Sequence, residues 1–258
     1  MNYTKDVIQG GPGVTQVRKL AELDDFRREQ EALRPLSLWN PMLPPGTVNA
    51  NDDEFNDRAL ATAWTEFDPG GRMTVAENKY GLLLTKTGVV GFEIGGIYKP
   101  LPAGDFTIAV HHVNLGQDNS DVGGICLWEN PLNLASKLYV FTSYRSDINT
   151  IRIAAFEFSN YTTLGTNISD TLAYVMSTSY FLRLRRNGVN YYIEFSGDGF
   201  GWKSPNNFAT ANPSFTPTSM GVMVTTNNGA VVSNQIYSFF RYQNSDVGYT
   251  AMLEGDRM

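Results

Sequence analysis

The sequence is poor in cysteine and in long apolar segments, and each shortage excludes a class of protein. The single cysteine, Cys126, excludes a disulfide framework within the chain, and the apolar residues around it predict a buried side chain. No apolar run approaches the ~20 residues of a membrane-spanning helix, so we expect no membrane partner. Residues 1–13 are polar and lack the apolar centre of a signal peptide, which predicts synthesis in a cytoplasm.

Positive charge is also scarce. Lys and Arg number 20 against 26 Asp and Glu, which gives a net charge of −6. Nucleic-acid binding relies on clustered Lys and Arg, and the only such cluster in the sequence is Arg183, Arg185 and Arg186. We predict that this cluster is a solvated strand face and that the protein has no nucleic-acid partner.

Residues suited to metal binding are few. The two histidines, His111 and His112, are neighbours on a predicted strand and therefore point to opposite faces, which prevents them from sharing a metal ion. Asp52, Asp53 and residues 118–121 carry the oxygen ligands that Ca²⁺ prefers. Acidic loops are more often solvated turns, so we predict no metal site and no cofactor, with a structural calcium ion as the open alternative.

Catalytic patterns are missing as well. No serine lies in a Gly-x-Ser-x-Gly string, and no histidine that could activate Cys126 lies near it in the sequence. Retaining glycosidases hold two carboxyl groups about 5–5.5 Å apart. Here Glu157 is isolated, while Glu54 and Asp57 are three residues apart and would fall on opposite faces of a strand. We predict no catalytic residues and a protein that is not an enzyme.

Short alternating segments separated by turn residues are abundant. In residues 180–202, Leu182 and Leu184 share one strand face while arginines occupy the other, and Asn187-Gly188 supplies the positive φ of a tight hairpin. Similar strand patterns recur at 82–84, 106–112, 125–128, 138–144, 151–158, 181–185, 191–195, 220–225 and 235–242. No helical period follows residue 34, so we predict an all-β jelly roll of two packed sheets. Residues 129–136 and 159–178 are predicted to be long loops.

The first 50 residues differ from the rest. Residues 15–34 predict one amphipathic helix, which Pro35 ends, and a proline-rich connector follows at 36–46. A helix this short needs a surface to pack on, whether its own domain, a copy of itself or another protein. The side chains expected to make that contact are Val17, Leu20, Leu23, Phe26, Leu33 and Trp39. We predict an anchoring arm at 1–50, a sandwich at 51–243 and a tail at 244–258.

Three parts of the sequence resemble concanavalin A-like lectin and glucanase domains. Residues 53–57 with Trp64 are similar to the first strand of such domains, 102–108 and 123–128 to central strands, and 182–202 to the late hairpin. The resemblance implies a concanavalin A-like β-sandwich. Glucanases of this fold carry a Glu-x-Asp-x-x-Glu string, which this sequence lacks, so a polysaccharide hydrolase is the less favoured alternative.

Residues 96–106 resemble concanavalin A-like modules in structural proteins of tailed bacteriophages. This resemblance implies a virion protein (a fibre, an appendage or a capsid decoration protein) that is located in the particle and anchored to capsid or tail proteins through residues 1–50. A parallel homotrimer, joined through the helix of the arm, is the preferred assembly. A free carbohydrate-binding module is the alternative.

A glycan is the expected external partner. Sugar sites combine an aromatic plane for stacking with a few hydrogen-bonding side chains. Five residues near predicted strand ends and loops offer these groups: Trp128, Tyr144, Arg145, Tyr161 and Trp202. We treat them as candidates for a carbohydrate-binding site, with aromatic residues of the core or its rim as the open alternative.

Overall fold

The computed structural model describes residues 50–78, 81–88, 91–115, 121–147, 150–173, 179–197, 199, 201–204, 211–226 and 232–244. The chain divides into two units, Met1–Pro45 and Gly46–Met258, and every described residue belongs to the second. The predicted helix, the proline-rich connector and the tail after residue 244 lie outside the described residues. So do the six predicted contact residues of the arm, Val17, Leu20, Leu23, Phe26, Leu33 and Trp39.

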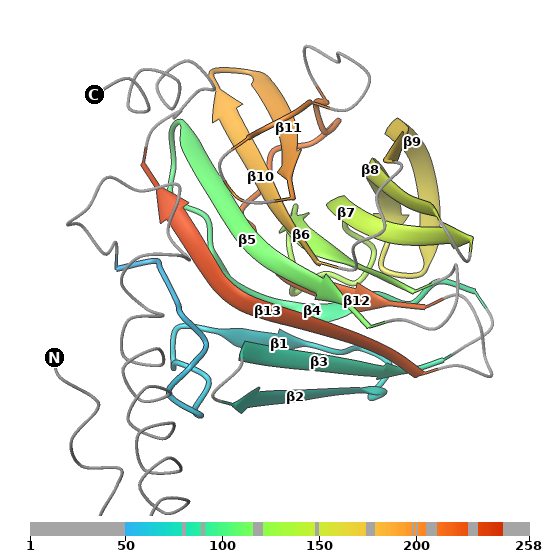
Figure 1. The fold of residues 1–258 in the computed structure, drawn as a ribbon. Coiled ribbons are helices and arrows are strands. Elements are labelled where there is room, and N and C mark those ends of the chain that lie inside the picture. The colour runs from blue at the N-terminus through green and yellow to red at the C-terminus, as the bar shows by residue number, and fades with distance from the viewer. Residues whose placement is uncertain are drawn as a thin grey trace, which may run out of the picture. The chain divides into compact units, whose positions relative to one another are not determined.

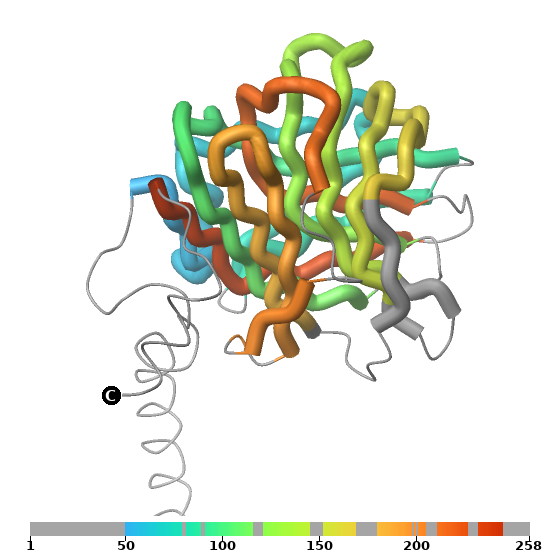
Figure 2. The backbone as a smooth tube through the Cα atoms, turned by 90° about the horizontal axis from the view of Figure 1, so that it is seen from above, coloured from blue at the N-terminus to red at the C-terminus, as the bar shows by residue number. Residues whose placement is uncertain are grey.

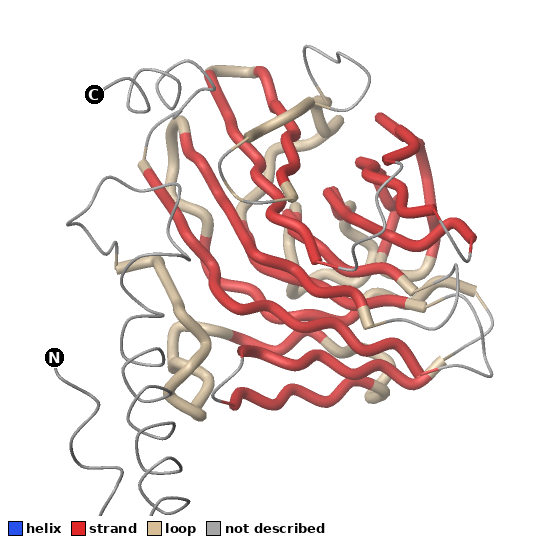
Figure 3. The backbone as a smooth tube through the Cα atoms, viewed as in Figure 1, coloured by secondary structure: helices blue, strands red, loops and turns tan. Residues whose placement is uncertain are grey.

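The described residues form thirteen strands and no helix, and so none that could span a membrane (Figure 3). The strands are β1 (Thr65–Phe67), β2 (Met73–Asn78), β3 (Gly81–Thr87), β4 (Gly95–Pro100), β5 (Phe106–Asn114), β6 (Val122–Trp128), β7 (Leu138–Asp147), β8 (Thr150–Asn160), β9 (Thr163–Ala173), β10 (Ser179–Asn187), β11 (Asn190–Ser196), β12 (Ser219–Thr225) and β13 (Val232–Gln243).

Two antiparallel sheets pack face to face (Figure 1). The seven-stranded sheet has the order β1-β4-β12-β6-β7-β8-β9, and the six-stranded sheet has the order β11-β10-β5-β13-β3-β2. Central neighbours come from distant parts of the chain: β12 pairs with β4 and β6, and β13 pairs with β3 and β5. Figure 2 shows β5, in green, between β13, in red, and the orange hairpin of β10 and β11. The predicted all-β sandwich is confirmed.

Alternating apolar side chains fill the space between the sheets. Ile108 and Val110 of β5 and Leu182 and Leu184 of β10 point inward from the six-stranded sheet and are fully buried. Ile125 and Leu127 of β6 point inward from the other sheet. Burying one large apolar side chain is worth about 1.5–3 kcal/mol, and a slip of one residue would turn all of them outward. The core therefore determines the register of the strands.

All nine segments predicted as strands lie within observed strands, and residues 129–136 form the predicted loop between β6 and β7. The second predicted loop, 159–178, is wrong in part because it contains β9 (Thr163–Ala173). This strand lies at the edge of its sheet and pairs with β8 through three register shifts. An edge strand is exposed and needs no regular apolar alternation, which is why its Thr, Ser and Asn residues gave no strand pattern.

The predicted solvated face of arginines is wrong for Arg183 and Arg185. Both guanidinium groups are buried and both bond Glu194 Oε2, from Arg185 Nε at 2.9 Å. The chain after β11 folds back, so that Lys203 pairs with Phe195 and the ring of Trp202 lies 4.1 Å from the Arg183 guanidinium carbon. This returning segment covers a strand face that alternation alone predicts to be solvated.

Gly188 tests the predicted hairpin, since its φ of 60° lies in the left-handed region. We expect Gly188→Val to destabilise the sandwich by about 1–3 kcal/mol, because a β-branched residue is strained at that φ. In a domain of this size the melting temperature should fall by roughly 2–4 °C per kcal/mol. Thermal unfolding followed by circular dichroism measures the change.

Gly197→Ala is the matched control, because Gly197 lacks a left-handed φ and an added Cβ would meet no atom within 4 Å. Its melting temperature should stay level or rise slightly. Equal melting temperatures for Gly188→Val and the unmodified protein would contradict the turn assignment.

Candidate functional site

The seven-stranded sheet is apolar on both faces, and its outer face carries a second cluster of aromatic side chains. Residues directly opposite one another in an antiparallel pair share a face. Trp128 lies opposite Leu138 of β7, and Leu138 lies opposite Phe158 of β8. The buried members of the cluster are Phe67, Ile94, Val122, Cys126, Trp128, Leu138, Val140, Phe158 and Met223. We refer to this surface as the aromatic face.

Half-buried rings surround the buried part of the aromatic face. They belong to Phe92, Tyr98, Tyr144, Phe156 and Tyr161. The ring of Tyr98 lies 5.8 Å from that of Trp128, and the ring of Phe92 lies 5.7 Å from that of Phe158. Phe67 links the two sides, with its ring centroid 5.9 Å from Trp128 and 6.2 Å from Tyr161. Partly exposed rings of this kind can stack on the apolar face of a ligand.

Three of the five predicted glycan-binding residues, Trp128, Tyr144 and Tyr161, meet on this face. Arg145 follows Tyr144 on β7, and its side chain lies outside what the structure describes. Trp202 belongs to the outer face of the six-stranded sheet, against Arg183. Trp128 is 1% exposed and Trp202 is 2% exposed, so the planes of both rings are covered in this conformation.

Sequence reasoning missed five aromatic residues of the site. Tyr98, Phe156 and Phe158 lie on strands, where alternation places them opposite residues of the outer face, so the pattern contained a signal for them. Phe67 ends a strand of three residues, and Phe92 lies between strands. Neither of these has a sequence pattern that would indicate its position.

The indole N–H of Trp128 is buried and has no hydrogen-bond partner among the described residues. A buried donor without an acceptor costs about 1–3 kcal/mol. The aromatic rings around it supply no strong acceptor, and the neighbouring Cys126 is a buried thiol whose pKa burial raises well above its ordinary value. An oxygen atom of a ligand would satisfy this donor.

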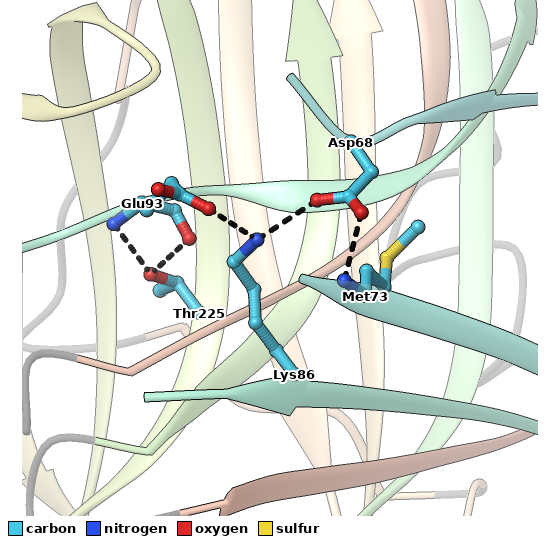
Figure 4. Close-up of polar contacts among 5 residues, drawn as sticks. All are labelled: Asp68, Met73, Lys86, Glu93 and Thr225. Atoms are coloured by element: carbon cyan, nitrogen blue, oxygen red, sulfur yellow. Dashed lines mark hydrogen bonds and ion pairs between the residues drawn. The ribbon is translucent and has the colours of Figure 1, made fainter. Parts of the chain in front are cut away.

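An ion triad fixes the chain segments that cover the aromatic face (Figure 4). The ammonium group of Lys86, on β3, is fully buried and lies 3.0 Å from Asp68 Oδ1 and 2.8 Å from Glu93 Oε1. Asp68 directly follows Phe67, and Glu93 lies between Phe92 and Ile94. The triad therefore connects the six-stranded sheet to both segments that place rings over Trp128 and Phe158.

The two histidines point to opposite faces of the sheet, as predicted. His112 is fully buried between the sheets, with Nε2 2.7 Å from Gln235 Oε1 and Nδ1 2.8 Å from Ser143 Oγ. An amide oxygen only accepts, so Nε2 carries the proton and the Ser143 hydroxyl donates to Nδ1. Burial lowers the pKa of His112 to about 4 and keeps it neutral. Ser143 is fully buried and cannot contact a substrate. We therefore assign this network a structural role in the interior.

Asp52 and Asp53, expected as calcium ligands in the alternative, make other contacts. Asp52 Oδ1 accepts from the backbone N–H of Tyr242 at 2.7 Å, and Asp53 Oδ2 accepts from the indole N–H of Trp64 at 2.7 Å. Across the described ranges, no three His, Cys, Asp or Glu side chains are placed to hold a metal ion.

Two carboxyl groups meet where the sequence predicted no pair. Glu77 of β2 lies beside Asp57, and its Oε1 accepts from the backbone N–H groups of Asp57 at 3.0 Å and Arg58 at 3.1 Å. Burial, followed by a hydrogen bond with Asp57, raises the pKa of Glu77 to about 7, while that hydrogen bond lowers the pKa of Asp57. Carboxyl groups with pKa values pushed apart can divide the roles of acid and base.

The other glutamates considered from the sequence are engaged in ion pairs. Glu157 Oε1 lies 3.1 Å from Lys137 Nζ and also accepts from the Ser214 hydroxyl at 2.6 Å. Glu194 binds the two buried arginines described above, and Glu54 contacts Arg241. These carboxylates stabilise local structure.

No family model and no similar curated protein matches this chain. Among solved structures, the chain is similar to the GH43 protein BlXynB from Bacillus licheniformis, with 14% identity, a TM-score of 0.54, and coverage of 78% of this chain and 40% of that one. A β-glucanase from Bacillus licheniformis gives 14% identity, a TM-score of 0.53, and coverage of 77% and 99%. A xylan β-1,4-xylosidase from Bacillus halodurans gives 11% identity, a TM-score of 0.52, and coverage of 78% of this chain and 40% of that one.

These comparisons support the concanavalin A-like β-sandwich, and they correct one prediction. The sequence-based prediction that the protein is not an enzyme is contradicted, because the neighbours are glycoside hydrolases. The chain spans 40% of the length of the GH43 protein and of the xylosidase, and 99% of the length of the β-glucanase. At these identities the likeness establishes the fold alone.

The raised pKa of Glu77 predicts how stability depends on pH. The unfolded chain loses the Glu77 proton near its ordinary pKa of 4.5, while the folded protein keeps it until about 7. Stability should therefore fall as the pH rises from 4.5 to about 7 and then level off. Melting temperatures measured across this range should show the slope, and Glu77→Gln should flatten it.

Glu157→Gln is the control. Hydrogen bonds from Ser214 and Lys137 outweigh burial and lower the pKa of Glu157, so its contribution to stability is lost only below its ordinary pKa of 4.5. An unchanged slope in Glu77→Gln would show that other groups produce the pH dependence.

Proposed function

We propose that the protein binds carbohydrate on the aromatic face of the seven-stranded sheet. The observation that carries this proposal is the buried indole N–H of Trp128, which lacks an acceptor among the described residues and lies beside half-buried rings. A sugar offers both complements, since its C–H face packs on aromatic rings and its hydroxyl and ring oxygens accept hydrogen bonds.

The chemistry of the face favours an uncharged polysaccharide. Its described cluster consists of aromatic, aliphatic and sulfur-containing side chains, and the charged Arg152 lies beside it, opposite Tyr144. The structural neighbours are named for xylan and β-glucan, which are neutral polymers. Soluble xylan and β-glucan are therefore the first ligands to test.

Trp128→Phe separates the ring from its N–H group. The variant keeps the apolar plane and should lose about 1 kcal/mol of binding, roughly a five-fold rise in Kd for the polysaccharide that binds. Titration calorimetry with soluble xylan and β-glucan measures Kd. Trp202→Phe is the matched control, because the indole N–H of Trp202 is also buried without a described partner but lies on the other sheet. Equal Kd values for both variants would contradict the assignment of Trp128 to the binding site.

Hydrolysis of the bound polysaccharide is a second candidate function, favoured by the carboxyl pair of Asp57 and Glu77 with its separated pKa values. The same mixtures of protein and polysaccharide should be assayed for new reducing ends. Release that disappears in Glu77→Gln would support cleavage by this pair. Binding without release would restrict the function to recognition.

We also propose that the sandwich is carried on a bacteriophage particle, as a homotrimer anchored to other virion proteins through residues 1–50. The support is the resemblance of residues 96–106, which include all of β4 except Gly95, to modules of phage structural proteins. A fibre, an appendage and a decoration protein all fit this role.

The mass of the protein in solution tests the proposed arm. We expect a trimer for the full chain and a monomer for a chain that begins at Asn51, because the proposed helical contacts lie in the removed part. Light scattering coupled to gel filtration measures both masses. A monomer in both cases would contradict the trimer and would mean that the arm binds a different protein.

A further inference from the structure

Trp128 lies under a cover made of two short pieces of chain. One piece is Phe67, at the end of β1, and the other is residues 91–94, between β3 and β4. Phe67 packs on Trp128 at a ring distance of 5.9 Å, and Phe92 packs on Phe158 at 5.7 Å. Tyr98 of β4 also packs on Trp128, at a ring distance of 5.8 Å, and Trp128 is 1% exposed. We refer to Phe67 and residues 91–94 as the cover.

Among the described residues, the backbone of the cover is bonded at only a few points. Phe67 ends the three-residue edge strand β1 and pairs with Gly96 of β4. The N–H of Ile94 donates to the carbonyl oxygen of Tyr161 at 2.8 Å, and the Thr225 hydroxyl bonds the backbone of Glu93, accepting at 3.3 Å and donating at 2.9 Å. A central strand such as β12 is instead bonded along both edges by two neighbours. Segments with few such bonds open at lower free energy than the sheet they lie on.

The ion triad is the attachment that the two pieces of the cover share. Lys86 reaches from the six-stranded sheet and holds the carboxylates of both pieces, Asp68 at 3.0 Å and Glu93 at 2.8 Å. Asp68 Oδ2 also accepts from the backbone N–H of Met73, and a Cβ added at Gly70 would clash with Glu93 Oε1, so a larger residue there would displace that carboxylate. Buried ion pairs add little net stability but fix geometry, because separating the partners leaves buried charge uncompensated.

We propose that the cover is a lid over the aromatic face and that the triad of Lys86, Asp68 and Glu93 holds it closed. A polysaccharide reaches Trp128 when the lid opens. This inference rests on the proposed function, since it assigns the regulation of the same site. Lys86 is a positioning residue in this arrangement, because it acts through Phe67 and Phe92. Without the triad, the lid would open at a lower free energy, and less of the binding free energy of a ligand would be spent on opening it.

The test reads the exposure of Trp128 directly, with no ligand present. The full chain contains four tryptophans, which fluorotryptophan labelling converts into fluorine NMR signals, and Trp128→Phe assigns the signal of interest. A soluble nitroxide then broadens each signal according to its exposure. In Lys86→Met we expect the Trp128 signal to shift and to broaden several-fold more than in the unmodified protein. The signals of Trp64 and Trp202 should stay unchanged, whereas general unfolding would move all of them.

Lys137→Met is the matched control, because it also removes a lysine paired with a glutamate, at 3.1 Å from Glu157, away from the cover. It should leave the Trp128 signal unchanged. If Lys86→Met fails to fold, the triple variant Asp68→Asn, Lys86→Met, Glu93→Gln removes the triad without leaving a buried charge. A Trp128 signal that stays as shielded in that variant as in the unmodified protein overturns the lid.

Binding measurements separate the lid from the proposed function. Polysaccharide binding that depends on Trp128 should become tighter in Lys86→Met if the lid limits access. Binding that depends on Trp128 while the indole stays shielded in Lys86→Met overturns the lid and keeps the function. An exposed indole in Lys86→Met, with no binding of xylan or β-glucan by any variant, keeps the lid and overturns that function.

Discussion

Burial of the seven-stranded sheet on both of its faces is the constraint on which the rest of the structure depends. The inner face has an obvious partner in the six-stranded sheet, and alternation on β5, β6 and β10 supplies the side chains. The outer face carries Trp128, Val140 and other apolar residues, which must also leave water. Phe67, at the end of the edge strand β1, and residues 91–94 take part of that role, and they need attachments of their own.

The attachments are polar groups placed at the margins of the apolar layers. Lys86 joins the two sheets through Asp68 and Glu93, while on the other side of the molecule Glu194 joins Arg183 and Arg185 beneath Trp202. These buried charges are tolerated because each of them has an opposite charge within bonding distance. In both places an aromatic ring next to the ion pairs closes the surface. The sandwich is therefore extended outward by ion pairs as well as by apolar packing.

The same arrangement bears on function. A concanavalin A-like sandwich with rings over one sheet face offers a surface for sugars, and the indole N–H of Trp128 gives that surface a specific donor. The carboxyl pair of Asp57 and Glu77 lies instead beside the segment that precedes β1. Recognition and any cleavage would thus use different parts of the chain. The likeness to glycoside hydrolases establishes the fold that both functions would share.

The sequence by itself determined the strands, the turn at Gly188, the opposite directions of His111 and His112, and the burial of Cys126, because these depend on neighbours in the chain and on a period of two residues. It also brought forward Trp128, Tyr144 and Tyr161 as candidates.

Only the tertiary structure decided which of these residues meet. The contacts of Lys86 with Asp68 and Glu93, of Trp202 with Arg183, and of Glu77 with Asp57 join positions on different strands or loops. Such contacts depend on the path of loops, and loop residues such as Phe92 carry no periodic pattern. The physical reason is that alternation tells which face a side chain occupies, whereas packing of distant segments decides what covers that face.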